Sequence, residues 1–137
     1  MLLMEACKSM GGFHVMTKKL VLKPGPKHPI TIQPLGRKVV VHLNGQVIAE
    51  SENALELKEA QYPTAIYIPR SDANMNMLER SAHNSYCPYK GDASYYSIPA
   101  GGAKTQDAVW TYETPFESVT PIKDHLAFYP DKVEIVS

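Results

Sequence analysis

The segment Tyr86–Gly91 (Tyr-Cys-Pro-Tyr-Lys-Gly) joins the residue types that are best able to do chemistry. Cys87 would be a nucleophile if the cation of Lys90, or His83, raised its thiolate fraction. The alternative, which is favoured because free cysteine is among the most buried residue types, is a small core residue. Lys90 would hold an anionic ligand or act as an acid or base, and the alternative is a solvated loop lysine. Gly91 lets the backbone turn tightly or approach a ligand, so Cys87 and Lys90 are the candidate catalytic residues.

A second cation, Arg70, stands beside Ser71 and Asp72, just before a segment that is expected to be helical. Its guanidinium would fork onto a carboxylate or phosphate, helped by the first amides of the helix. The structural alternative is an ion pair with a carboxylate elsewhere in the domain. For Asp72 or Ser71 the favoured prediction is a helix cap, because these residue types commonly accept hydrogen bonds from first-turn amides.

Aromatic side chains complete a predicted ligand pocket. Strand alternation puts Trp110 and Tyr112 on one face, whereas Tyr95 and Tyr96 point to opposite faces. The two cations would orient an anionic group, and the aromatic rings would stack on a planar or apolar part of the ligand. The alternative places Trp110 in the core, with tyrosine hydroxyls at its rim. The predicted lining is Tyr67, Arg70, Cys87, Lys90, Tyr96, Trp110 and Tyr112.

Short elements must position these residues. Four prolines hold residues 23–35 extended, as an arm or an edge strand in which Ile30 and Ile32 alternate with polar residues. Asn44-Gly45 is the favoured type I′ turn of a hairpin between strands at 37–43 and 46–50. The other expected strands are 54–59, 64–68, 93–98, 108–113, 126–129 and 133–136, with one or two helical turns as the alternative for 54–59.

A single helix is expected from Ala73 to about Ser81, with Met75 and Leu78 as its small apolar face. Many short strands and one short helix predict an all-β fold, either a bent barrel or a sandwich of short antiparallel strands.

Length and composition limit the classes of function. A chain of 137 residues fits one domain. We take residues 23–137 as a single β-domain, and residues 1–22 as a disordered or extra N-terminal segment. Lys and Arg equal Asp and Glu at 14 each, so we expect neither nucleic acid nor membrane as a partner. Two cysteines, Cys7 and Cys87, cannot make a disulfide framework. The default expectation is therefore a reduced, cytoplasmic protein.

Six ordered blocks resemble the domain of unknown function 427 family over about residues 25–136. They are residues 47–51, 67–72, 87–91, 95–96, 110–112 and 128–130. The resemblance implies a β-tent, in which two sheets meet at an angle beside a small helix. Some schemes label the family nucleotidyltransferase-like, which is a name and no evidence of activity. Related β-tent proteins often hold zinc with two Cys-x-x-Cys pairs, but here Lys90 stands where the second thiolate would lie, so we expect no metal and no cofactor.

The first functional hypothesis is a small-molecule binding domain, with an enzyme left open. The alternative is a non-catalytic protein-interaction or self-association module that uses a sheet edge or the proline-rich arm, which leaves a homo-oligomer open. The sequence specifies neither the ligand nor the reaction class.

Overall fold

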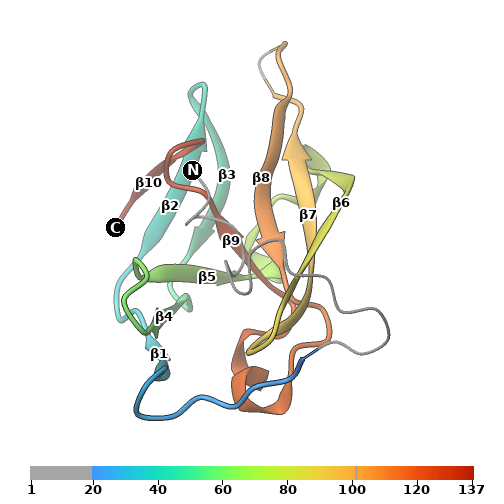
Figure 1. Ribbon diagram of the computed structural model, residues 1–137. Coiled ribbons are helices and arrows are strands. Elements are labelled where there is room, and N and C mark those ends of the chain that lie inside the picture. Colours follow the sequence, from blue (N-terminus) through green and yellow to red (C-terminus); the bar gives the residue numbers. More distant parts are fainter. Residues whose placement is uncertain (1–19, 101) are drawn as a thin grey trace.

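Short strands build two antiparallel sheets in residues 20–100 and 102–137, the part of the chain that this computed structural model describes (Figure 1). The larger sheet contains, in spatial order, β1 (Ile30–Pro34), β4 (Leu55–Glu59), β5 (Ala65–Pro69), β9 (His125–Phe128), β8 (Thr105–Thr111), β7 (Gly91–Ile98) and β6 (Glu79–Cys87). The smaller sheet contains β10 (Glu134–Val136), β2 (Val39–Leu43) and β3 (Gln46–Ser51). The all-β prediction is confirmed, but the sheets do not close into a barrel. No helix in the described residues is long and apolar enough to cross a membrane.

The β2–β3 hairpin follows directly from its sequence. Asn44 and Gly45 have φ angles of 53° and 78°, the left-handed pair that a type I′ turn requires. Val39 and Val41 are fully buried, which places one face of the hairpin in the core. The predicted hairpin is therefore confirmed, with strand bounds one or two residues from those expected.

The proline-rich arm ends as an edge strand, as predicted. β1 pairs with β4 and lies at one end of the larger sheet. Ile30 and Ile32 are partly buried while Thr31 and Gln33 are exposed, so the alternation in the sequence matches the two faces of the strand.

The predicted helix over residues 73–81 is wrong. Two 3₁₀ turns, η2 (Arg70–Asp72) and η3 (Met75–Met77), replace its first part, and β6 begins at Glu79. Ala73 bridges to Ala49 of β3, and Leu78 is extended with φ −118° and ψ 144°. A single 3₁₀ turn already brings positions i and i+3 together, so the Met75 and Leu78 spacing did not distinguish it from an α-helix.

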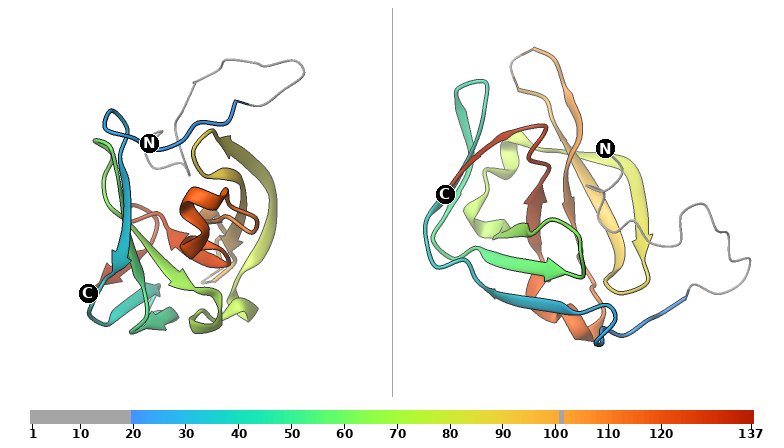
Figure 2. Two further views of the ribbon diagram at one scale, coloured as in Figure 1. Left: turned by 90° about the horizontal axis from the view of Figure 1, so that it is seen from below. Right: turned by 60° about the vertical axis from the view of Figure 1, so that its left-hand side comes forward.

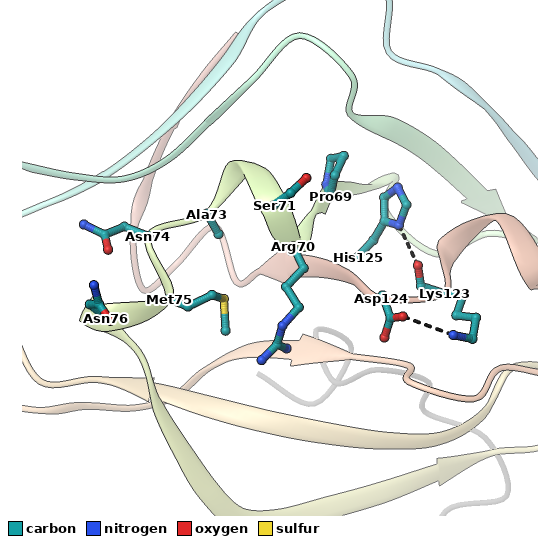
Figure 3. A pocket seen from close by; sticks show the side chains of 10 residues that line it. All are labelled: Pro69, Arg70, Ser71, Ala73, Asn74, Met75, Asn76, Lys123, Asp124 and His125. Carbon is teal, nitrogen blue, oxygen red and sulfur yellow. Dashed lines mark hydrogen bonds and ion pairs between the residues drawn. The ribbon is translucent and has the colours of Figure 1, made fainter.

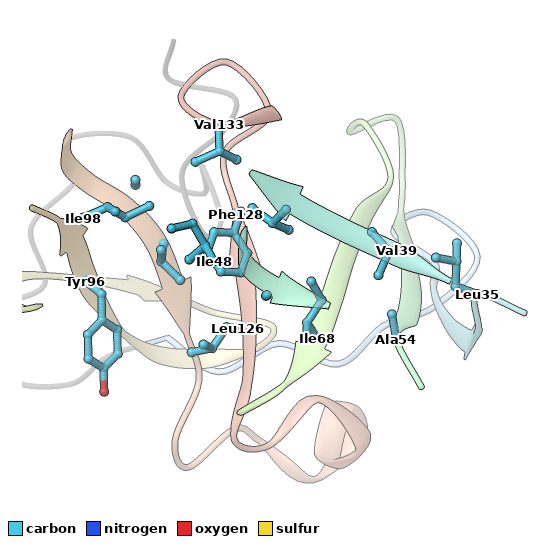
Figure 4. Packing of buried hydrophobic residues seen from close by; sticks show 14 residues of the cluster. Leu35, Val39, Ile48, Ala54, Ile68, Tyr96, Ile98, Leu126, Phe128 and Val133 are labelled. Carbon is cyan, nitrogen blue, oxygen red and sulfur yellow. The ribbon is translucent and has the colours of Figure 1, made fainter. Parts of the chain in front are cut away.

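The larger sheet carries a hydrophobic core on each face. The first core packs against the smaller sheet and contains Val39, Ile48, Ile68, Tyr96, Val109 and Phe128, among others (Figure 4). The second core contains Leu57, Tyr67, Cys87, Tyr95, Trp110, Tyr112, Val119, Ile122 and Tyr129, among others. Figure 2 shows the larger sheet curving around the 3₁₀ segment η4 (Glu117–Ile122), which supplies Val119 and Ile122 to this second core.

Candidate functional site

A groove lies where β5 ends and β9 begins (Figure 3). We call it the Arg70 groove; its volume is about 760 Å³, and its lining is Pro69, Arg70, Ser71, Ala73, Asn74, Met75, Asn76, Lys123, Asp124 and His125. Backbone hydrogen bonds hold the two walls together, because the Arg70 amide donates to the Asp124 carbonyl at 3.0 Å. The Asn74 amide donates to the Ile48 carbonyl at 2.8 Å and ties the same segment to β3. The groove is therefore shaped by backbone hydrogen bonds between segments that are distant in the sequence.

The guanidinium of Arg70 is held in place by an aromatic hydroxyl. Its Nη1 donates to the Tyr96 hydroxyl at 2.9 Å, and its Cζ lies 5.7 Å from the centroid of the Tyr96 ring. No acidic side chain in the described residues forms an ion pair with Arg70. Because a guanidinium has five N–H donors, several remain available to a ligand.

The other charged groups of the groove lie along its second wall. Lys123 pairs with Asp124 at 3.1 Å, and Nδ1 of His125 lies 2.9 Å from the Lys123 carbonyl (Figure 3). With His125 neutral, Arg70 and Lys123 exceed Asp124 by one positive charge. The groove is therefore suited to an anion.

The predicted helix caps at Ser71 and Asp72 are wrong, because both residues lie inside η2, whose N-cap is Pro69, and the N-cap of η3 is Asn74. Instead, Oδ2 of Asp72 accepts a hydrogen bond from the Ser51 hydroxyl at 2.6 Å. Ser51 is buried at the end of β3, so this contact fixes the turn that carries Arg70 to the smaller sheet.

The seven predicted pocket residues divide between the two faces of the larger sheet. Arg70 and Tyr96 meet on the side of the first core. The other five lie together on the opposite side, where each is at most 4% exposed: Tyr67, Cys87, Lys90, Trp110 and Tyr112. The expectation that Arg70 and Lys90 face one common hollow is therefore not met.

Cys87 is fully buried and is not a free thiol in this structure. Its burial matches the favoured structural interpretation of this residue, as a side chain packed in the second core. A nucleophilic role requires a thiolate, which a sulfur that is not a free thiol does not supply, so this structure does not support that role for Cys87.

Lys90 belongs to a buried ionic cluster. Its Nζ contacts Oε1 of Glu59, and Oε2 of Glu59 lies 2.7 Å from Nε2 of His28. The side chains of Lys90 and Glu59 are 1% and 5% exposed, whereas that of His28 is 22% exposed. His28 also stacks on Tyr89, with ring centroids 3.8 Å apart and planes 2° apart. The solvated-loop interpretation of Lys90 is therefore wrong.

Burial determines the protonation of the polar groups around this cluster. It raises the pKa of Tyr112 well above its ordinary value, and it raises the pKa of Tyr67 against the effect of the hydrogen bond with Trp110. Burial lowers the pKa of Lys90, while the charge of Glu59 and its hydrogen bond oppose that shift. Both phenols therefore remain hydrogen-bond donors at neutral pH.

Tyr112 differs from its neighbours in lacking a partner. The Tyr67 hydroxyl accepts a hydrogen bond from Nε1 of Trp110 at 3.0 Å, and the Tyr95 hydroxyl lies 2.8 Å from the Ser85 hydroxyl. The Tyr112 hydroxyl is buried and has no hydrogen-bond partner among the described residues. Such a group in a native structure requires an explanation.

Glu59 and His28 were missed as site residues, although the sequence held a signal for one of them. The alternation that turns Leu55 and Leu57 inward also turns Glu59 inward, since it lies two residues further along β4. His28 carries no such signal, because its place depends on how the arm crosses to Tyr89. No group of three or more metal-ligating side chains occurs in residues 20–100 and 102–137.

The sequence model of a family that is described as a domain of unknown function (DUF427) matches residues 31–137. No curated protein matches the chain in sequence.

Proposed function

The chain belongs to the domain of unknown function DUF427 family, and we propose that this domain binds a small anionic molecule in the Arg70 groove. One observation carries the proposal: a guanidinium that is fixed by Tyr96 lies in a groove and has no acidic partner among the described residues. Arg80, by contrast, donates to both carboxylate oxygens of Glu113 through Nη1 and Nη2.

The dimensions and lining of the Arg70 groove suit a metabolite-sized ligand. Its volume of about 760 Å³ lies within the range of roughly 300–1,000 Å³ that is usual for ligand sites. Pro69, Ala73 and Met75 supply apolar surface, while Asn74 and Asn76 supply amides that can orient a polar group. The ligand is therefore expected to combine an anionic end with an apolar or planar body.

A carboxylate or a phosphate fits Arg70 best, because the guanidinium fork matches two oxygens of either group. Lys123 would contribute less, since Asp124 already neutralises it. Arg70→Gln is expected to weaken binding about 10- to 100-fold, the equivalent of a charge-assisted hydrogen bond of roughly 1.5–3 kcal/mol.

Thermal melting with two probes, benzoate and adenosine monophosphate, tests the proposal. At about a hundredfold excess over Kd a ligand stabilises by roughly 2.7 kcal/mol, which a melting scan resolves. Arg80→Gln is the matched control: Arg80 lies 5.6 Å from the same Tyr96 ring but outside the groove lining. Stabilisation that survives in Arg80→Gln and disappears in Arg70→Gln supports the proposal; equal loss in both variants, or no shift with either probe, refutes it.

Self-association through a sheet edge is a second candidate function. β1 is an outermost strand, and its only strand neighbour in the described residues is β4. An open edge can pair with a second copy of the chain. The test is the mass in solution over a range of protein concentrations. It is measured for the full chain and for Thr31→Pro, which changes an exposed residue of β1. A full chain that is monomeric at all concentrations removes the candidate.

A further inference from the structure

The buried cluster on the other face of the sheet has more hydrogen-bond donors than acceptors. The Lys90 ammonium has three donors, and Glu59 is its only side-chain acceptor in the described residues. The Tyr112 hydroxyl adds another donor with no partner there. Lys90 Nζ lies 5.9 Å from the centroid of the Tyr112 ring, so the unused donors belong to one region. Within residues 20–100 and 102–137, that region has no acceptor oxygen for these donors.

Charge decides what kind of oxygen fits. Lys90 and Glu59 form a pair that is neutral overall, and both side chains are at most 5% exposed. The second oxygen of Glu59 is held by His28. A carboxylate placed beside Glu59 would bury an uncompensated negative charge, which is costly in a low-dielectric interior. A neutral acceptor, such as the carbonyl oxygen of an amide or a ketone, would satisfy the donors without that cost.

We propose that Lys90 and Tyr112 form a second ligand site, which binds a small neutral molecule through its carbonyl oxygen. This site is separate from the Arg70 groove, because Lys90 and Tyr112 lie on the side of the second core and Arg70 on the side of the first.

Residues 20–29, which we call the strap, control access to this site. The strap runs from β1 to the turn between β6 and β7 (Figure 1). Its Leu22 amide donates to the Pro88 carbonyl at 2.9 Å, and its Leu20 carbonyl accepts from the Tyr86 hydroxyl at 2.5 Å. His28 holds the other end against Glu59. Because Lys90 is only 1% exposed, a ligand enters when the strap moves.

Acetamide and acetate are the matched probes, since they have nearly the same shape and differ in charge. Amide NMR spectra of the full chain are recorded as each probe is added. We expect saturable shifts at Lys90, Gly91 and Tyr112 with acetamide and none there with acetate. Tyr112→Phe should weaken acetamide binding about fivefold, the equivalent of one neutral hydrogen bond.

Two further variants test where acetamide binds and how it reaches the site. Arg70→Gln should leave the acetamide shifts unchanged, which separates this site from the groove. Tyr86→Phe removes one of the two hydrogen bonds that hold the Leu20 end of the strap and should speed exchange between the free and bound states. Equal shifts with both probes, unchanged acetamide affinity in Tyr112→Phe, or no saturable shift near Lys90 would overturn the proposal. An exchange rate that Tyr86→Phe leaves unaltered would overturn the role of the strap.

Discussion

Removing the Tyr112 hydroxyl should stabilise the free protein. This hydroxyl is buried without a hydrogen-bond partner among the described residues. An unsatisfied buried polar group costs roughly 1–3 kcal/mol, whereas the ring of phenylalanine fills the same space. Tyr112→Phe is therefore expected to raise the free energy of unfolding by about 1 kcal/mol, the lower end of that cost.

Tyr67→Phe is the matched control, because it makes the same chemical change in the same core. The Tyr67 hydroxyl accepts a hydrogen bond from Nε1 of Trp110, and both residues are at most 4% exposed. Its loss leaves the indole N–H buried and unpaired, at a cost of about 1–3 kcal/mol. The two substitutions should therefore change stability in opposite directions.

Urea and thermal unfolding of the two variants provide the assay. For a chain of this length, 1 kcal/mol corresponds to about 3–4 °C in Tm, so the variants should melt at least about 6 °C apart. If Tyr112→Phe destabilised the protein as much as Tyr67→Phe, the Tyr112 hydroxyl would have a partner and the reasoning would be refuted.

Two other predictions concern charge. Burial raises the pKa of Tyr67 and Tyr112, so the folded state keeps protons that the unfolded state releases above about pH 10. The free energy of unfolding should therefore fall as the pH rises beyond that value. The lowered pKa of Lys90 acts in the opposite sense up to the ordinary lysine pKa of 10.5. Urea unfolding between about pH 8 and about pH 12 should therefore show the loss of stability mainly at the upper end, and less steeply in Tyr112→Phe. Lys90→Met should destabilise by about 3–5 kcal/mol because it removes the buried partner of the Glu59 carboxylate and leaves it only the contact with the partly exposed His28. The double variant Lys90→Met/Glu59→Met should recover part of that loss. A double variant that is no more stable than Lys90→Met in the same urea assay would contradict this explanation.

Local signals in the sequence were sufficient for much of the sheet. Asn44-Gly45 specified its turn through backbone sterics alone, and alternation in β1 specified which side chains face inward. The same period of two held the information that Glu59 points into the core. The prediction of a helix over residues 73–81 was wrong because its spacing signal was short. The backbone of this segment pairs instead with β3 at Ala73 and with β7 from Glu79 onward.

What the sequence determined by itself is therefore the family, the mainly β fold and the residue types that gather around Lys90. The tertiary structure alone decided which of them share a surface. Arg70 and Asp124 are far apart in the chain and meet only because β5 pairs with β9. Lys90 and Arg70 were expected together but lie on opposite sides of the larger sheet, Lys90 beside Tyr112 and Arg70 beside Tyr96. Local patterns in the sequence do not say which segment will cover each face of a sheet.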